Sequence, residues 1–230
     1  MKSDALKVSI IVPTLNEASV VEESLAAIAR LDPHEIIVAD GGSADNTVSL
    51  ALNIATRIVT SRPGRALQMN AGAKEATGEL LLFMHADSKL TLESYEIMKE
   101  KMSHHKSAGG AFSLQIESEK ISLRLISTLA TWRSKYLNLV YGDQTIFVRT
   151  DIFQILKGFS PLPICEDLEF FRRLSRQGKV ILLNEKTHTS SRRWMTEGIL
   201  FTTLRNIIIA TLFLVGFSPH FLTKWYIVVR

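Results

Sequence analysis

The sequence has very little cysteine: Cys165 is the single one in 230 residues. No disulfide can form within the chain, so a reducing, cytoplasmic location is expected. Because no histidine is placed to pair with the thiol, Cys165 is expected to be a small buried side chain and not a nucleophile.

Long apolar runs are also missing. The run at 8–12 is too short for the core of a signal peptide and ends at Pro13, so it is expected to belong to the mature fold. The run at 207–217 has eleven residues, with Arg205 and Asn206 directly before it. A buried or interfacial helix is therefore predicted there, and not a transmembrane one.

Glycine-rich phosphate loops are absent as well. Neither the G-x-G-x-x-G pattern nor the G-x-x-x-x-G-K-[ST] pattern occurs in the sequence. This absence counts against dinucleotide oxidoreductases and P-loop kinases. There is also no internal repeat and no low-complexity segment.

Positive charge exceeds negative charge only slightly. The chain has 27 Lys and Arg against 23 Asp and Glu, a formal charge of +4, which gives no indication of nucleic-acid binding. The basic excess lies in residues 186–230, which hold six basic side chains and one acidic one. With 46% hydrophobic and 22% charged residues the chain can bury a full core, which excludes a disordered tail, a collagen-like fibre and a disulfide mini-protein.

The first 90 residues alternate between strand and helix patterns. Buried strands are predicted at 8–12, 35–39, 58–60 and 79–84, with helices at 20–30, 47–55 and 67–76 between them. Such alternation favours parallel βαβ units in an open sheet. Ligands of these sheets bind beyond the carboxyl ends of the strands.

The second half is less regular. Helices are predicted at 92–102, 121–139 and 165–176, and strands at 109–116, 145–148 and 179–183, the first of these strands with one wet face. From about residue 199 the composition becomes apolar and basic. The expected organisation is one domain made of halves 1–90 and 91–198, followed by a helical tail at 199–230.

Three polar loops fall at the predicted strand ends, at 13–17, 40–43 and 85–87. Asp87 follows a buried strand with His85 on the same side, and its carboxylate can hold a divalent cation that neutralises a diphosphate; alternatively Asp87 caps the next helix. Asp40 can accept hydrogen bonds from a ribose or a base, and Gly41 lets backbone approach a ligand; alternatively both only form a turn.

Acidic and basic clusters follow in the second half. Glu166, Asp167 and Glu169 stand in the first turn of a predicted helix, which is where the helix dipole favours acids, but a general base must be presented at such a rim. Asp167 is the stronger candidate, because Glu169 is at helical spacing from two arginines. At 192–194, two arginines and Trp194 suit diphosphates and a sugar or base ring, or else form a solvated basic turn.

In order and spacing, these motifs resemble a family 2 glycosyltransferase with the GT-A fold, over roughly residues 7–215. The motifs are 8–17, 37–47, 85–87 and 166–167; a bacterial subgroup is further resembled at 64–72, Gly142-Asp143-Gln144 and 191–194. The resemblance implies a Rossmann-like, mostly parallel central sheet flanked by helices. It implies that 1–90 binds a nucleotide sugar and that 91–198 binds the acceptor and carries catalysis.

The resemblance also implies roles for single residues. Donor binding would involve Pro13, Thr14, Asn16, Glu17, Asp40, Gly41, Arg65, Ala86, Asp87, Gln144, Arg193 and Trp194. Asp167, with Glu166, would serve catalysis as the base of an inverting displacement. Asp87 and His85 would hold Mg²⁺ or Mn²⁺, although the family's usual Asp-x-Asp is His85-Ala86-Asp87 here, so the first carboxylate is missing.

The sequence fits two other functions less well. A nucleotidyltransferase of sugar phosphates would have a glycine-rich arm after the first strand, which is absent. A noncatalytic, membrane-docked binding module is disfavoured by the retained acids at 87, 166 and 167. The tail at 199–230 suits peripheral attachment to the inner face of a membrane, consistent with a lipid-linked or envelope-glycan acceptor, or equally a homodimer contact.

Overall fold

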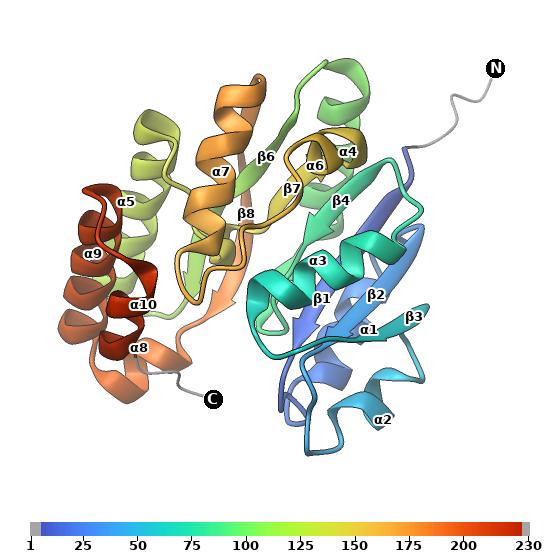
Figure 1. The fold of residues 1–230 in the computed structure, drawn as a ribbon, viewed down its shortest axis with the longest axis horizontal. Coiled ribbons are helices and arrows are strands. Elements are labelled where there is room, and N and C mark those ends of the chain that lie inside the picture. Colours follow the sequence, from blue (N-terminus) through green and yellow to red (C-terminus); the bar gives the residue numbers. More distant parts are fainter. Residues whose placement is uncertain (1–5, 227–230) are drawn as a thin grey trace.

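A computed structural model describes residues 6–226. Its centre is an eight-stranded sheet in the order β3-β2-β1-β4-β7-β6-β8-β5, with helices on both faces (Figure 1). The four pairings β1–β2, β1–β4, β2–β3 and β6–β8 are parallel and the other three are antiparallel, so the sheet is mixed.

The first half contains the predicted parallel βαβ units. Its strands are β1 (Val8–Thr14), β2 (Glu35–Asp40), β3 (Arg57–Thr60) and β4 (Leu80–Phe83). Its helices are α1 (Val21–Ala29), α2 (Thr47–Ala51) and α3 (Arg65–Glu75). The β-branched and leucine runs are buried on both sides of the sheet, as parallel strands between helices require.

The second half completes the sheet with strands of both directions. They are β5 (Ser88–Leu90), β6 (Gly109–Glu117), β7 (Ile146–Arg149) and β8 (Val180–Ser190). The prediction that the strand at 109–116 has one wet face is wrong, because β6 is buried on both faces. Leu114 and Ile116 pack against Leu123, and Ser113 on the other face donates a hydrogen bond to the Leu183 carbonyl.

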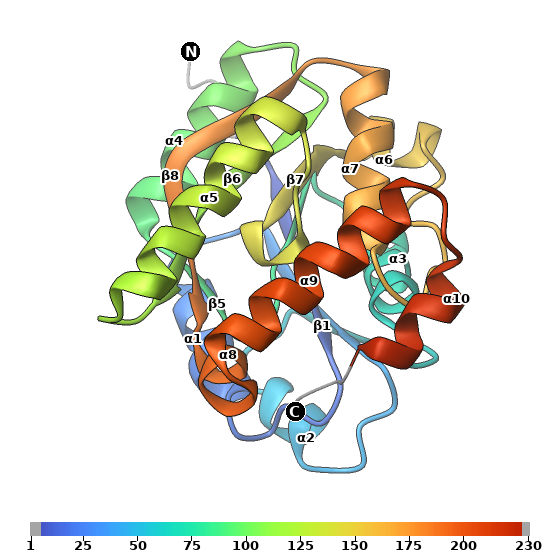
Figure 2. The ribbon, with the colours of Figure 1, turned by 90° about the vertical axis from the view of Figure 1, so that its left-hand side faces the viewer.

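The remaining helices surround these strands. They are α4 (Leu92–His104), α5 (Ile121–Leu137), α6 (Thr150–Ile155), α7 (Glu166–Gln177), α8 (Arg192–Glu197), α9 (Ile199–Leu214) and α10 (Pro219–Leu222), with 3-10 turns η1 (Gly142–Gln144) and η2 (Thr223–Trp225). Figure 2 shows α5, α9 and α10 together on one side of the molecule. None of the helices in the described part of the chain is long and apolar enough to cross a bilayer.

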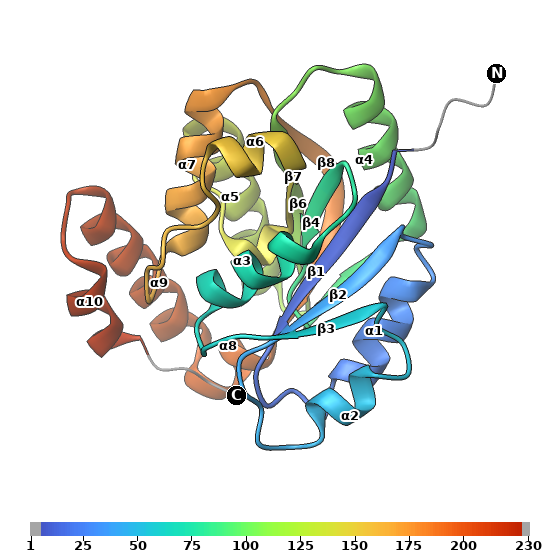
Figure 3. The same ribbon diagram turned by 45° about the vertical axis from the view of Figure 1, so that its right-hand side comes forward.

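Two apolar clusters hold the layers together, one on each face of the sheet, and both extend from the first-half strands to β6 and β7. Val21 and Leu25 of α1 pack with Ile10 on one face, while α3 and α7 pack on the other (Figure 3). Gly72 lets α3 lie close to the sheet, because a Cβ there would be 2.7 Å from the Ile11 Cγ2. This close packing fixes Arg65, the first residue of α3, at the carboxyl ends of the strands.

Candidate functional site

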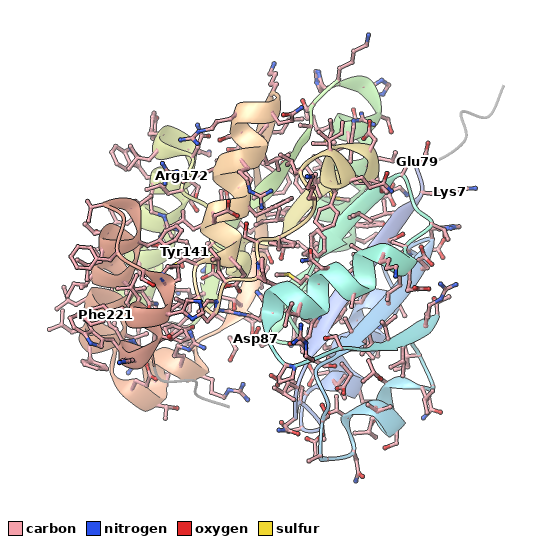
Figure 4. All side chains as sticks on the ribbon, viewed as in Figure 1. Lys7, Glu79, Asp87, Tyr141, Arg172 and Phe221 are labelled. Carbon is pink, nitrogen blue, oxygen red and sulfur yellow. The ribbon has the colours of Figure 1, made fainter. Side chains whose placement is uncertain are left out.

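A cavity of about 490 Å³ opens at the carboxyl ends of β1 and β4. It is walled by the loops after these strands, the start of α3, the start of α7, and the segment from α8 to η2. In Figure 4, Asp87 and Tyr141 lie at this end of the sheet, while Lys7 and Glu79 lie at the opposite end. The cavity is therefore at the edge where open α/β sheets bind ligands.

Ten of the predicted site residues line this cavity. They are Pro13, Thr14, Glu17, Arg65, His85, Ala86, Asp87, Asp167, Arg193 and Trp194. The structure does not bring the other five to its lining: Asn16, Asp40, Gly41, Gln144 and Glu166.

Asp40 and Asn16 join two loops to each other. The Asp40 carboxylate is 2% exposed and accepts hydrogen bonds from the Gly42 and Ser43 amides, each at 2.8 Å. Asn16 accepts one from the Ala44 amide at 2.9 Å, and its own amide donates to the Ser43 Oγ. These hydrogen bonds, together with the one that Thr14 Oγ1 donates to the Asp40 Oδ1, hold the loops after β1 and β2 in register.

Gln68 is a buried residue that sequence reasoning missed. Its Nε2 donates to the Thr14 carbonyl at 2.6 Å and to the Ala39 carbonyl at 3.0 Å, so α3 is tied to the ends of β1 and β2. The predicted ligand residue Gly41 faces this side chain, since a Cβ there would lie 3.1 Å from the Gln68 Cδ.

Gln144 is likewise structural in its contacts. Its Nε2 donates to the Phe112 carbonyl at 3.1 Å, and its Oε1 accepts from Ser134 at 2.6 Å and from Arg133 at 3.2 Å. Since every polar atom of the 1%-exposed amide is used within the fold, Gln144 fixes the η1 turn that carries Gly142 and Asp143.

Glu166 forms a buried ion pair with Arg65. The Arg65 Nε lies 2.8 Å from Oε1, and the carboxylate side chain is 2% exposed, against 38% for the arginine. Burial raises the pKa of Glu166, and Arg65 opposes that rise. Glu166 does not line the main cavity. It lines a second, small cavity of about 10 Å³, which has about the volume needed for one water molecule.

Asp167 and His85 meet at Gly142. The Asp167 Oδ2 accepts a hydrogen bond from the Gly142 amide at 2.5 Å, and Oδ1 accepts one from the Leu168 amide at 2.7 Å. A Cβ at Gly142 would lie 2.6 Å from the His85 Nε2 and 3.1 Å from the Asp167 Oδ2. Only glycine leaves room for both side chains at this position.

Burial shifts the pKa values of several cavity groups. It raises the pKa of Asp143 to about 6, against an opposing effect of Arg133, and that of Tyr141 to about 12. Burial, and then the charge of Arg65, lower the pKa of His85, so its imidazole is neutral at pH 7. The cavity therefore holds a carboxyl group that titrates near neutrality and an uncharged imidazole.

Tyr226, which the sequence pattern assigns to an apolar tail, lines the cavity together with Asn206. Its hydroxyl accepts a hydrogen bond from Arg193, whose guanidinium lies 5.0 Å from the centre of its ring. The local pattern around Tyr226 is apolar and basic, so no sequence signal distinguished it. Tyr141 and Asp143 could have been found from their position beside the Gly142 motif.

A metal ion at this site would have to be shared with a ligand. Within residues 6–226 no group of three or more His, Cys, Asp and Glu side chains is arranged to hold one. Asp87 nevertheless lines the cavity, and the buried Asp143 Oδ1 has no hydrogen-bond partner among the described residues. This donor set fits Mg²⁺ or Mn²⁺, because Mg²⁺ is commonly held by one or two carboxylates plus the phosphates of a substrate.

Comparison with known proteins identifies the family. The profile of glycosyl transferase family 2 matches residues 9–157, and the chain belongs to this family. A PGL/p-HBAD biosynthesis glycosyltransferase of Mycobacterium tuberculosis (strain ATCC 25618 / H37Rv) is 41% identical over 91 residues. That match covers 36% of this chain and 36% of the relative, so the chain spans about a third of the length of this curated relative.

Solved structures share the fold. A mannosyltransferase from Pyrobaculum calidifontis, in complex with GDP-Man and Mn²⁺, superposes with a TM-score of 0.65 at 23% identity, over 81% of this chain and 57% of that one. TarS of S. aureus in complex with UDP gives 0.64 at 21% identity, over 80% of this chain and 60% of that one. The architecture is thus the GT-A fold expected from the sequence.

Proposed function

We propose that the protein transfers a sugar from a nucleotide-diphosphate sugar, UDP- or GDP-linked, to an acceptor hydroxyl. The observation that carries this is one cavity at the strand ends that contains Asp87, Arg65, Arg193 and Asp167. A cation ligand, two phosphate-pairing guanidinium groups and a carboxylate base are the groups that this reaction requires. Membership of the family and the ligands of the related structures support the same function.

Donor binding falls to the loop after β1 and the start of α3. Thr14 and Glu17 line the cavity beside Arg65, which Glu166 holds in place. Trp194 contributes a buried indole N–H that has no partner in the part of the chain that the structure describes, and it can donate to a ligand. The loops that contact the donor are shaped by Asp40, Asn16 and Gly41, which support donor binding in this way.

The transfer follows from these positions. Asp87 would hold Mg²⁺ or Mn²⁺ together with the donor diphosphate, and the bound ion would neutralise charge on the leaving group. Asp167 accepts the proton of the acceptor hydroxyl as its oxygen bonds to the anomeric carbon. The bond from that carbon to the diphosphate breaks, and the nucleoside diphosphate leaves with the electron pair. A single displacement of this kind inverts the anomeric configuration.

The acceptor is a lipid-linked or envelope-glycan hydroxyl in this proposal, reached at the inner face of a membrane. Residues 199–226 support peripheral contact, because α9 and α10 expose Leu200, Phe201 and Phe221 and contain no acidic residue. The His85-Ala86-Asp87, Gly142-Asp143-Gln144 and 191–194 motifs all contribute residues to the cavity or its support, which agrees with the bacterial subgroup.

Calorimetric titration with a panel of nucleotides and nucleotide sugars, with and without Mn²⁺, tests the donor site. We expect one nucleotide class to bind in a metal-dependent manner, and Asp87→Ala to abolish that dependence. A matched control is Asp151→Asn, an exposed acid in α6. If no nucleotide binds, the proposed function is wrong and a noncatalytic role takes its place.

A further inference from the structure

Exposed apolar side chains gather on one side of the molecule. Of nineteen exposed large hydrophobic residues in the described part of the chain, sixteen lie between 121 and 137 or between 195 and 225. We call this the apolar face and define it by Ile121, Leu125, Leu129, Trp132, Tyr136, Leu200, Leu204, Ile207, Ile208, Phe221 and Trp225. Patches of this extent on a folded protein mark an interaction site.

Helix α5 is inverted relative to an ordinary surface helix. Its exposed apolar residues follow one stripe at 121, 125, 129, 132 and 136, whereas its inner side carries hydroxyl groups. Ser127 accepts a hydrogen bond from the Ile116 amide at 2.9 Å, and Thr131 accepts one from the Leu114 amide at 3.1 Å. These hydroxyls satisfy backbone groups of β6 on an inner side that also buries Leu123, whereas the outer apolar stripe stays exposed.

Helix α9 has the same inversion. Leu200, Leu204 and Ile207 are 72%, 49% and 53% exposed. On the inner side, Arg205 pairs with Glu197 at 2.5 Å, and both side chains are less than one tenth exposed. Helices α5 and α9 thus each bury polar groups beside a few apolar ones and present leucine and isoleucine to the outside.

The two stripes form one surface. Figure 2 shows α5 and α9 crossing the same side of the molecule with α10 next to α9, and α5 and α9 are in contact. Figure 4 shows Phe221 at the outer edge of this side. Trp132, Tyr136 and Trp225 add the amphipathic rings that favour a membrane–water boundary.

Charge within the segments that carry the apolar face has one sign, although the exposed Glu117 and Glu119 lie just before α5. Residues 120–142 and 198–226 contain no Asp or Glu. Lys120, Arg124, Lys135 and Lys224 are exposed in these segments. The face is therefore complementary to an anionic surface. A second copy of the chain would place these cations against each other, which disfavours a homodimer through this face.

We propose that the apolar face docks on the surface of an anionic lipid bilayer, with the α5 and α9 stripes in the interface and the basic side chains among the headgroups. The docking surface is thereby extended from the C-terminal segment to α5. It also bears on the acceptor, and this part rests on the proposed function. Asn206, Ile209 and Ala210 on the inner side of α9 line the cavity, so one helix separates bilayer from active site. A lipid-linked acceptor could reach the cavity without leaving the membrane.

Flotation of the purified protein with vesicles of phosphatidylcholine, with and without phosphatidylglycerol, tests the docking surface at low and high salt. We expect binding that needs the anionic lipid and weakens with salt, and a blue shift of tryptophan fluorescence that is reduced in Trp132→Phe and in Trp225→Phe and lost when both are combined. Leu129→Glu combined with Ile207→Glu should weaken vesicle binding by about tenfold or more. The matched control is Leu52→Glu combined with Ile155→Glu, at exposed positions outside the face.

Nucleotide binding by calorimetry shows in the same samples that each variant is folded, and it separates failure of docking from failure of the proposed function. Absence of binding to anionic vesicles at low salt would overturn the docking proposal. The proposal would also be overturned if the protein did not bind vesicles and instead sedimented as a dimer that Leu129→Glu dissociates. The apolar face would then bind a second copy of the chain.

Discussion

Two adjacent carboxyl groups at the start of α7 lie in different surroundings. Glu166 is buried against Arg65, whereas Asp167 lines the cavity and is oriented by the Gly142 amide. A carboxylate committed to a buried ion pair is unavailable as a base. We therefore propose Asp167 as the catalytic base and Glu166 as a residue that positions Arg65.

Asp167→Asn should abolish sugar transfer, by about 100-fold or more, and leave nucleotide affinity nearly unchanged, because the amide cannot accept the acceptor proton. Transfer assays and calorimetry on the same preparation measure the two effects. Asp151→Asn, the same change in the first turn of α6, should alter neither. Equal loss of binding and transfer in Asp167→Asn would indicate a structural role.

Asp143 predicts a pH dependence of stability. Its pKa is raised by burial to about 6, above the ordinary value of an aspartate. Between about pH 4 and pH 6 the folded state binds a proton that the unfolded state has lost, so this group's contribution falls as pH rises through that window. Asp143→Asn should add on the order of 2 kcal/mol to the free energy of unfolding at pH 8 and nothing at pH 4.

Denaturant unfolding in the presence of a chelator measures this difference. A constant difference between the variant and the parent across pH 4–8 would show that Asp143 ionises normally in the folded protein.

At residue scale the sequence indicated loops that do line the cavity, but not which hydrogen bonds each side chain makes. Asp40 and Gln144 stand in motifs that point to a ligand, yet their polar atoms bond within the fold. A single sequence shows which side chain is present. It does not show whether a backbone group of the fold already forms a hydrogen bond with that side chain.

At the scale of elements, the close packing of α3 on the sheet places Arg65 and Gln68 at the strand ends. Gly72→Val should push α3 away from Ile11, lower the free energy of unfolding by about 3 kcal/mol and weaken nucleotide binding. Lys74→Val on the exposed side of the same helix has the same β-branched side chain without the clash. Similar losses in both variants would attribute the effect to helix propensity instead of packing.

Element prediction succeeded where periodicity was strong and failed where partners decided the structure. The strands at 8–12 and 35–39 are continuous β-branched runs, and both were predicted. The last strand was predicted to end at residue 183, but β8 continues to Ser190. The polar part of β8 after residue 183 is a strand because it pairs with β6 on one side and with the three-residue β5 on the other.

At the scale of the whole molecule, the Arg65–Glu166 pair joins α3 of the first half to α7 of the second. Arg65→Met would leave Glu166 buried without its counter-charge, and its pKa, already raised by burial, would rise further. Such a carboxyl group destabilises the folded state more as pH rises. We expect a loss of about 3 kcal/mol at pH 8 and a much smaller one at pH 5.

The double variant Arg65→Met with Glu166→Gln tests the cause. It should recover most of the stability lost at pH 8, measured by the same denaturant titrations. A double variant as unstable as Arg65→Met would mean that the arginine contributes through packing and not by neutralising Glu166.

The cavity draws its walls from Pro13 to Tyr226, nearly the full length of the described chain. A chain that is still being synthesised can therefore form the first parallel strands long before it has a complete binding site. The hydrogen bond between Arg193 and Tyr226 can form only after Tyr226 has left the ribosome. Before that point, we expect the nascent protein to be partly folded but unable to bind its donor.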